Sequence, residues 1–213
     1  MITDERYTAY INSLEMGGPS YLNELEAYAV QNQVPIIRKE MQSFMRTLLV
    51  MNKPKRILEV GTAIGFSALW ISEYMPKDAH ITTIEKYEKR IPIARENFKK
   101  YGKEDQITLL EGDASDILCR LEGPFDLIFM DAAKGQYIHF LPEVLRLLPK
   151  GGVLLSDNVL QDGAIIESKF AVTRRDRTIH KRMREYLYTL KNHEQLETSI
   201  LTLGDGVALS VKK

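Results

Sequence analysis

Short apolar runs alternate with amphipathic segments through the middle of this chain. Segments with helical periodicity lie at residues 66–73, 88–101, 115–121 and 137–148. Runs with the length and composition of buried strands lie before and between them, at 56–60, 80–84, 106–110, 125–130 and 152–156. This alternation is typical of right-handed crossovers and predicts a parallel, doubly wound sheet. Ligands of such sheets bind at the carboxyl ends of the strands.

The two flanks of this alternating core have other patterns. Residues 21–28 and 39–51 predict two amphipathic helices, which we expect to cover a sheet edge or to form part of a lid. After the core, a long polar stretch from about residue 164 to 192 predicts a helix, and residues 199–203 and 207–211 flank a Gly-Asp-Gly turn that predicts a hairpin.

We therefore expect an α/β fold of the Rossmann-like, doubly wound class. Its seven-stranded sheet should be mostly parallel, with a C-terminal antiparallel hairpin. We expect a single domain over residues 1–213, with a helical extension at 1–52 and the core at 53–213.

Composition sets limits on the class of protein. The 29 Lys and Arg residues balance 29 Asp and Glu residues, so a nucleic-acid partner would require a local basic patch. A single cysteine, Cys119, excludes an internal disulfide, and the four scattered histidines lack the spacing of a zinc site. No apolar stretch reaches the roughly 18 to 20 residues that span a bilayer, and the N-terminus lacks a signal-peptide core. We therefore expect a cytoplasmic protein that does not bind membranes.

Glycines after the first predicted strand indicate a candidate ligand site. The segment ILEVGTAIGFSA places Glu59, Gly61 and Gly65 where the strand turns into a helix, and glycine there allows a ligand close to the backbone. The spacing lacks the dinucleotide fingerprint, and Phe66 after Gly65 excludes a phosphate loop. A pyrophosphate ligand, and with it an NAD-dependent oxidoreductase, is disfavoured; an ordinary tight turn remains the alternative.

Acidic residues follow the second and third predicted strands. Glu85 could accept hydrogen bonds from both hydroxyls of a ribose, and Asp113, in the segment EGDAS, could meet the amino group of an adenine. A ribose and an adenine without a diphosphate suggest S-adenosylmethionine. The alternative for each acidic residue is helix capping.

A second acidic cluster follows the fourth and fifth predicted strands. If these strands are neighbours, Asp131, Asp157 and Asn158 converge at one edge of the sheet. Two carboxylates and an amide oxygen suit a hard cation such as Mg²⁺, which keeps positions open for a substrate. Lys134 lies close by in sequence as a candidate base. The alternatives are helix caps, a turn asparagine and a solvated lysine.

The motifs ILEVGTAIGFSA, TIEKYEKR, GDA, FMDAAKGQY and LLSDNVL together resemble those of the metal-dependent class I O-methyltransferases of the catechol and caffeoyl-CoA type. This resemblance implies that Asp131, Asp157 and Asn158 hold Mg²⁺ and that Lys134 and Asp131 are catalytic, with Lys134 as the base. It implies that the methyl donor, S-adenosylmethionine, contacts Ile37, Glu59, Gly61, Ser67, Glu85, Asp113, Ala114 and Asp131. Catechol methyltransferases carry bulky residues after the first metal ligand. This chain has Ala132 and Ala133 there, which leaves room for a larger substrate.

The chemistry of methyl transfer is consistent with this set of residues. Transfer from a sulfonium needs an oxygen nucleophile held in line with the methyl group. A cation that binds two neighbouring substrate oxygens orients the acceptor and lowers the pKa of its hydroxyl, and Lys134 could then take the proton. The substrate should therefore carry vicinal oxygens, one of them an acidic hydroxyl.

An arginine-rich segment, SKFAVTRRDRTIHKRMREY, bears on which substrate accepts the methyl group. It is either the solvated face of a long helix or a patch that contacts phosphates, with the candidate contacts Arg174, Arg175, Arg177, Lys181 and Arg182.

Within the family, the chain resembles most the bacterial tRNA 5-hydroxyuridine methyltransferases, through EAYA, VPI, DAAKGQY, DNVL, the arginine-rich segment and GDGVALSVKK. This resemblance implies methylation of 5-hydroxyuridine at the wobble position, giving 5-methoxyuridine. It also implies the tRNA anticodon loop as partner, and together with the apolar N-terminal helices it favours a homodimer. The 5-hydroxyl and 4-oxo groups of this base lie on adjacent carbons, as catechol oxygens do, and a loop base is accessible without opening a duplex.

Two other functions remain as alternatives. A small-molecule O-methyltransferase for catechols or phenols would use the same chemistry on a different acceptor. A non-catalytic nucleotide- or RNA-binding module would have no need for Asp131, Lys134, Asp157 and Asn158 together.

Overall fold

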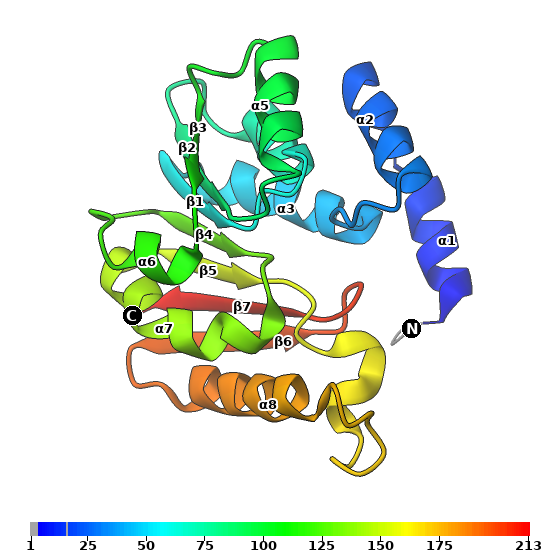
Figure 1. The fold of residues 1–213 in the computed structure, drawn as a ribbon, viewed down its shortest axis with the longest axis vertical. Coiled ribbons are helices and arrows are strands. Elements are labelled where there is room, and N and C mark those ends of the chain that lie inside the picture. Colours follow the sequence, from blue (N-terminus) through cyan, green and yellow to red (C-terminus); the bar gives the residue numbers. More distant parts are fainter. Residues whose placement is uncertain (1–3, 16) are drawn as a thin grey trace. The chain divides into compact units, whose positions relative to one another are not determined.

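The computed structural model describes residues 4–15 and 17–213, and within it the chain forms two compact units. One unit comprises Glu5–Ala114, and the other includes Ser115–Lys213. Figure 1 shows the helices and strands of each. The prediction of a single domain with a helical extension at 1–52 stays a prediction.

The unit Glu5–Ala114 combines N-terminal helices with three parallel strands. Its elements are α1 (Glu5–Ser13), α2 (Ser20–Gln31), α3 (Lys39–Asn52), β1 (Arg56–Val60), α4 (Phe66–Tyr74), β2 (His80–Glu85), α5 (Ile91–Lys100) and β3 (Ile107–Glu111). The strands have the order β3-β2-β1 and run parallel. Because Glu85 pairs with Glu111 in register, acidic side chains follow neighbouring strands at the same edge.

Helix α4 is the most deeply buried helix of this unit because its sequence, FSALWISEY, is apolar on nearly all sides. It packs against α2 and α3. Trp70, the single tryptophan of the chain, is only 5% exposed, and its indole N–H donates to the carbonyl oxygen of Gln42 at 3.1 Å. This hydrogen bond joins α4 to α3.

The unit that includes Ser115–Lys213 contains the other four strands. Its elements are β4 (Leu127–Met130), the 3₁₀ helix η1 (Lys134–Gln136), α7 (Tyr137–Leu147), β5 (Val153–Ser156), the 3₁₀ helix η2 (Gln161–Ile166), α8 (Arg177–Asn192), β6 (Leu196–Leu201) and β7 (Val207–Lys212). A short helix, α6 (Ala114–Leu118), precedes them. The strands have the order β4-β5-β7-β6. β4 and β5 are parallel, and β7 is antiparallel to both β5 and β6.

Helix α8 packs against β6 and α7 through one face. The buried residues of that face recur every three or four positions, as an amphipathic helix requires: His180, Met183, Tyr186 and Leu190. The remaining positions are mostly cationic and polar, so α8 presents a basic face.

The predicted fold class is confirmed. Seven strands, mostly parallel and ending in an antiparallel hairpin, alternate with helices. The adjacency of the fourth and fifth strands is confirmed as well. Helix α1, for which we made no prediction, is an additional element.

The predicted helix over residues 164–192 is wrong in its first half, because α8 begins only at Arg177. Left-handed backbone at Asp162 (φ 52°) and Gly163 (φ 91°) interrupts η2. Residues 167–176 then form turns and bends rather than a helix.

A local side-chain contact favours these turns over a helix. Thr173 Oγ1 donates to the Asp176 carboxylate, and the Asp176 N–H donates to the Thr173 carbonyl oxygen at 3.0 Å. Side chains of this kind offer the backbone an alternative to helical hydrogen bonds. Arg174 and Arg175 consequently precede the helix instead of lying on its face.

None of the helices in residues 4–15 and 17–213 is both long enough and apolar enough to cross a membrane.

Candidate functional site

A series of buried hydrogen bonds lies at the carboxyl end of strand β1. Glu59 is fully buried, and its Oε2 accepts a hydrogen bond from Thr83 Oγ1 on the neighbouring strand. The Thr83 hydroxyl is also 2.6 Å from the hydroxyl of Thr62. These contacts fix the Glu59 carboxylate at the carboxyl end of the strand, where the sequence predicts the methyl-donor site.

The glycine-containing turn after β1 has a backbone that restricts the residue type. Gly61 has φ 106° and Gly65 has φ 84°, both in the region that favours glycine. A Cβ atom at Gly65 would lie 2.5 Å from Cε1 of Phe98, so the turn approaches α5 too closely for any side chain. The turn is therefore specified by packing as well as by backbone conformation.

Glu85 lies at the end of β2 and organises this turn. Its Oε2 accepts the N–H of Ala63 at 2.7 Å, and its Oε1 accepts the N–H groups of Lys86 and Tyr87 at 2.9 and 2.8 Å. A carboxylate has about four acceptor positions, so these three bonds leave capacity for a ligand hydroxyl. The helix-cap alternative does not describe Glu85, because its partners, Ala63, Lys86 and Tyr87, all lie outside helices.

The remaining predicted donor residues of this unit differ in exposure. Asp113 is partly exposed, and its Oδ2 accepts a hydrogen bond from Lys86 Nζ at 3.1 Å. Ile37, Ser67 and Ala114 are buried, at 3%, 7% and 9% exposure. Ser67 lies in the first turn of α4, where N–H groups are free of intrahelical partners.

Asp131 and Asp157 follow neighbouring parallel strands in the other unit. Met130 pairs with Ser156 in register, and the Asp157 N–H donates to the Met130 carbonyl oxygen at 2.9 Å. Burial raises the pKa of Asp131, while the positive charge of Lys134 acts in the opposite direction. Burial also raises the pKa of Asp157, and the negative charge of Asp131 raises it further. The two carboxylates therefore repel each other electrostatically in a poorly hydrated place.

Lys134 is electrostatically coupled to both of these carboxylates. Its charge lowers the pKa of Asp131 and of Asp157 against the effect of burial. Lys134 begins η1 and is partly buried. The structure thus brings Asp131, Lys134 and Asp157 within electrostatic reach of one another.

Asn158 and Asp205 complete the polar cluster. Asn158 has a left-handed backbone (φ 58°), and its N–H donates to Asp157 Oδ1 at 2.7 Å. Its Nδ2 lies 3.4 Å from Asp205 Oδ2, so the amide oxygen is the end of the side chain that remains for a cation. Asp205 is 7% exposed and raises the pKa of Asp157 through its charge, a role that we did not predict for the Gly-Asp-Gly turn.

Tyr137 is a further residue of this cluster that the sequence did not reveal. It is fully buried, and its hydroxyl lies 3.0 Å from the Met130 carbonyl oxygen and 3.2 Å from that of Asp157. The same hydroxyl accepts the N–H of Ala132 at 3.2 Å. One phenol thus ties together the backbone at the ends of β4 and β5. Its spacing of six residues from Asp131 was visible in the sequence, but its partner 20 residues away was not.

The residues of this cluster fit a divalent cation. Two carboxylates whose charge is disfavoured by burial and by each other gain stability when a cation neutralises them. Within the described part of the chain, no three His, Cys, Asp or Glu side chains gather into a metal site. A cation held by Asp131 and Asp157 could also bind the Asn158 amide oxygen, with water or substrate oxygens in the other positions, as Mg²⁺ commonly does.

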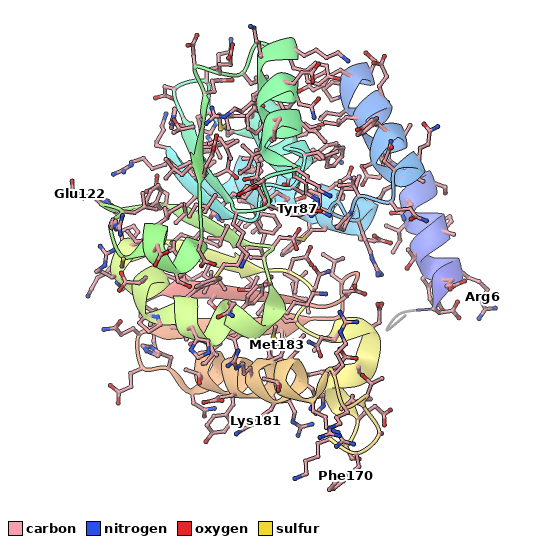
Figure 2. All side chains as sticks on the ribbon, viewed as in Figure 1. Arg6, Tyr87, Glu122, Phe170, Lys181 and Met183 are labelled. Atoms are coloured by element: carbon pink, nitrogen blue, oxygen red, sulfur yellow. The ribbon has the colours of Figure 1, made fainter. Side chains whose placement is uncertain are left out.

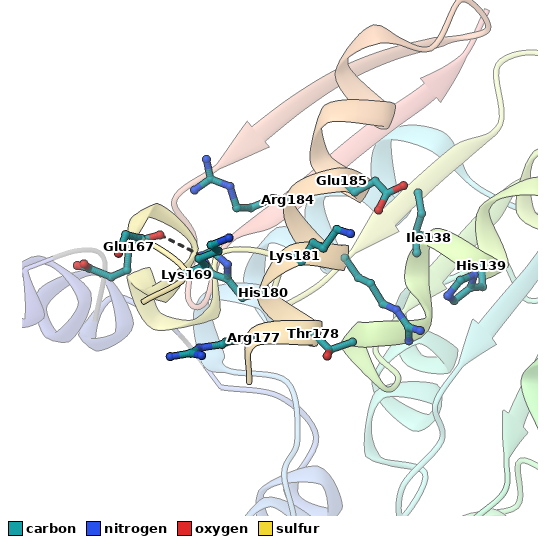
Figure 3. Close-up of a pocket in the computed structure, with 12 residues that line it drawn as sticks. Ile138, His139, Glu167, Lys169, Arg177, Thr178, His180, Lys181, Arg184 and Glu185 are labelled. Atoms are coloured by element: carbon teal, nitrogen blue, oxygen red, sulfur yellow. Dashed lines mark hydrogen bonds between the residues drawn. The ribbon is translucent and has the colours of Figure 1, made fainter. Parts of the chain in front are cut away.

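A groove of about 910 Å³ lies along the basic end of α8 (Figure 3). Its cationic lining residues are Lys169, Arg177, Lys181, Arg182 and Arg184. The carboxylates in its lining are Glu167 and Glu185. Three of the five predicted RNA contacts thus line one groove, and the other two, Arg174 and Arg175, are exposed in the preceding turn.

Arg182 connects this groove to the segment that carries Lys134. Its Nη1 donates to the carbonyl oxygen of Gly135 at 3.1 Å, although the two residues are 47 positions apart. Arg182 is only partly exposed. Its guanidinium therefore supports η1 in addition to contributing charge to the groove.

Comparison with known proteins gives matches over nearly the whole chain. Residues 12–213 match the model of a family described as O-methyltransferase. The catechol O-methyltransferase of Mycobacterium tuberculosis is 30% identical over 211 residues, which cover 95% of this chain and 93% of that protein. The catechol O-methyltransferase of Niastella koreensis is 35% identical over 128 residues, and this alignment spans 58% of each chain. Among solved structures, an SAH-bound methyltransferase of Podospora anserina has a TM-score of 0.88 and 32% identity, over 98% of this chain and 94% of that one.

Proposed function

Because the chain belongs to the O-methyltransferase family, we propose that it transfers a methyl group from S-adenosylmethionine to an oxygen of its substrate. The observation that carries this proposal is the pairing of Asp131 and Asp157 at adjacent strand ends, with Lys134 acting on both. A nucleotide-binding module without catalysis would gain nothing from two destabilised carboxylates beside a lysine.

The methyl donor would be held by the unit Glu5–Ala114. Glu85 offers its remaining acceptor capacity to a ribose hydroxyl, and the glycine turn allows the donor close to the backbone. The remaining donor contacts in this unit would be Ile37, Glu59, Gly61, Ser67, Asp113 and Ala114. The solved relative from Podospora anserina contains SAH, the product of such a donor.

Asp131, Asp157 and Asn158 would hold Mg²⁺. When bound, such a cation orients vicinal oxygens and makes a hydroxyl more acidic. Tyr137 keeps the backbone of both strand ends in place, and Asp205 holds the amide nitrogen of Asn158. The protein's own contribution is thus a rigid set of oxygen ligands.

Lys134 would accept the proton of the acceptor hydroxyl at its Nζ atom. The bond between the methyl carbon and the sulfonium sulfur breaks, and its electron pair stays on sulfur. The oxygen forms the new bond to carbon, while its proton passes to Lys134. The products are a methyl ether, S-adenosylhomocysteine and one proton.

The acceptor that we propose is 5-hydroxyuridine at the wobble position of tRNA, which would become 5-methoxyuridine. The groove along α8 supports this proposal, because cationic side chains are suited to RNA phosphates. The small side chains of Ala132 and Ala133 would leave room beside the first metal ligand for a base attached to its ribose. The partner would then be the tRNA anticodon loop, and the place of action would be the cytoplasm.

A small catechol or phenol is the second candidate acceptor. The names of the relatives from Mycobacterium tuberculosis and Niastella koreensis, both catechol O-methyltransferases, favour it. Both acceptors have the vicinal oxygens that the proposed cation site requires.

Mass spectrometry of nucleosides from tRNA of cells with and without the gene distinguishes the two acceptors. We expect loss of 5-methoxyuridine and accumulation of 5-hydroxyuridine in the deletion strain. Unchanged 5-methoxyuridine would contradict the tRNA proposal. Purified protein with Asp131→Ala should then transfer no methyl group to either acceptor, while its circular dichroism spectrum stays that of the wild type.

We also propose that the chain forms a homodimer through α1. This helix buries none of its own side chains, and its large apolar residues recur at the spacing of one helical face. They are Tyr7 (65% exposed), Tyr10 (64%) and Ile11 (52%), and Leu14 (63%) follows directly after the end of the helix. A second copy of the same stripe is a suitable partner, since isologous contacts bury one apolar surface against its equal.

A further inference from the structure

Phe170 is an exposed aromatic residue flanked by two cationic side chains. It is 74% exposed. Lys169 Nζ lies 5.0 Å from the centre of its ring, and the guanidinium carbon of Arg177 lies 6.0 Å from it. Because three quarters of the residue is accessible, the two cations leave most of the ring surface open. Figure 2 shows Phe170 at the outer end of the loop that precedes α8.

The loop that presents Phe170 is tied to α8 by hydrogen bonds. The buried His180 ring lies 3.1 Å from the carbonyl oxygen of Glu167, the contact drawn in Figure 3. Arg184 Nη1 donates to the carbonyl oxygen of Ile165 at 3.0 Å. The loop is thus held before any ligand arrives, which reduces the entropy cost of binding.

The ring lies beside the cationic groove. Lys169 and Arg177 contact Phe170 and also line the groove, together with Lys181 and Arg184. A ligand for this arrangement needs a flat aromatic group with several negative charges next to it. An unpaired nucleotide within an RNA strand has both, since its base stacks on aromatic rings and its phosphates pair with lysine and arginine.

We propose that Phe170 is a stacking site for an unpaired base of the RNA substrate, with Lys169 and Arg177 contacting the phosphates on either side of that base. This inference rests on the proposed function, because it assigns the RNA loop a second contact besides the methylated base. The site would select loops over duplexes, since bases inside a duplex have no free face.

Binding of a fluorescent anticodon stem-loop that carries 5-hydroxyuridine tests the stacking site by anisotropy. Phe170→Ala should weaken binding about tenfold, whereas Phe170→Trp should retain it, because stacking depends on the aromatic face. The slope of log affinity against log salt should stay unchanged in Phe170→Ala. It should fall by about one in Lys169→Ala or Arg177→Ala, because each of these removes a phosphate contact.

Tyr188→Ala is the matched control. Tyr188 is 72% exposed and lies further along α8, and we expect its removal to leave stem-loop affinity unchanged. Wild-type affinity of Phe170→Ala for the stem-loop would overturn the inference. An equal loss of affinity for a blunt duplex would overturn it too, because no base is unpaired there. Adenosine 3′,5′-bisphosphate binding as tightly as the stem-loop would overturn RNA as the occupant.

Methylation of the same stem-loop by the wild-type protein separates this inference from the proposed function. If the wild type forms 5-methoxyuridine and Phe170→Ala does so with the same KM, the stacking site alone is wrong. If the wild type forms none, the proposed tRNA function is wrong.

Discussion

The Tyr137 hydroxyl lies 3.2 Å from the carbonyl oxygen of Asp157, the residue after β5 and 20 positions later in the chain. The same oxygen lies 3.0 Å from the Met130 carbonyl oxygen, one residue before Asp131. A buried phenol therefore fixes the spacing of the two proposed metal ligands through their backbones. We infer that it acts as a positioning residue, because its hydroxyl contacts the backbone at the two strand ends.

Tyr137→Phe should weaken metal binding. Removal of the hydroxyl leaves the Ala132 N–H without its partner, which costs about 1–3 kcal/mol of folding stability, and it frees the two strand ends. We expect Mn²⁺ affinity, measured by electron paramagnetic resonance, to fall several-fold, together with a rise in the metal concentration needed for half-maximal activity.

Tyr186→Phe is the control for this variant. Tyr186 is equally buried and packs edge-on against Tyr137, but its hydroxyl meets Ser156 Oγ at 2.7 Å and neither strand-end carbonyl. It should lose comparable folding stability and keep its Mn²⁺ affinity. Equal Mn²⁺ affinities in the two variants would refute the positioning role of Tyr137.

Asp157→Asn should change stability in opposite directions with and without metal. Burial and the charge of Asp131 raise the pKa of Asp157, so the folded state favours the neutral carboxyl. The neutral Asp157 carboxyl therefore contributes its full stability to the fold below pH about 4. This contribution is lost as the pH rises through the raised pKa of Asp157. We therefore expect the metal-free variant to have a higher Tm than the metal-free wild type at pH 8 and a similar Tm near pH 4.

Mg²⁺ should reverse this order at pH 8. It should raise the Tm of the wild type and leave that of Asp157→Asn nearly unchanged, because ligand binding stabilises only a protein that binds it. Thermal unfolding in chelator and in excess Mg²⁺ measures both effects. A wild type indifferent to Mg²⁺ across this pH range would speak against a cation at Asp131 and Asp157.

Glu73→Gln should reduce stability at neutral pH but not in acid. Burial raises the pKa of Glu73, but hydrogen bonds from Lys103 (2.8 Å) and Tyr21 (2.6 Å) outweigh it and hold the pKa below the usual value. The stabilisation is present above the unfolded-state value of about 4.5 and is lost as the pH falls through the lowered pKa. We expect a loss of about 1–2 kcal/mol at pH 7 in urea denaturation series, which disappears in acid once the pH has fallen through the lowered pKa of Glu73.

The control for Glu73 is Asp78→Asn. Asp78 pairs with Lys55 at the surface, where solvent screens the charges. This variant should match the wild type at every pH. If Glu73→Gln and Asp78→Asn gave the same pH profile, the partly buried network around Glu73 would have no special role.

Ile11→Glu should prevent the proposed dimer. A carboxylate in the centre of the α1 stripe would have to be buried without a partner in the interface. Sedimentation velocity should show a dimer for the wild type and a monomer for the variant at the same concentration. Val50→Glu is a matched control, since Val50 is 60% exposed but belongs to α3. Identical sedimentation of wild type and Ile11→Glu would exclude this face as the interface.

The sequence was sufficient to predict those elements whose structure depends on residues adjacent in the chain. Every predicted strand is present, and the apolar run at residues 56–60 even has the bounds of β1. The strand predicted at 199–203 begins earlier, because β6 spans Leu196–Leu201. The placement of Asp131 and Asp157 directly after the paired ends of two strands followed from one topological assumption, that β4 and β5 are neighbours. The helix over 164–176 was wrong because the Thr173–Asp176 turn is a side-chain interaction that hydrophobic periodicity does not register.

The sequence did not predict the roles of Asp205 and Tyr137, because both depend on contacts between residues far apart in the chain. Asp205 meets Asn158 across 47 positions, and Tyr137 meets Asp157 across 20. Nothing in the local sequence around either residue specifies these partners. The stacking environment of Phe170 has the same origin, because Arg177 contacts the ring only when the loop turns back toward the start of α8.

The chain has one tryptophan, Trp70, and one cysteine, Cys119, and each can be used to follow unfolding at a single place. The Trp70 indole, hydrogen-bonded to Gln42, makes intrinsic fluorescence a reporter of the unit Glu5–Ala114. The exposed Cys119 thiol offers a single attachment point for a dye in the unit that includes Ser115–Lys213. Denaturation followed by tryptophan emission and by the emission of a dye on Cys119 therefore reports on each unit separately. Coincident transitions would mean one cooperative domain, and separate transitions would mean two.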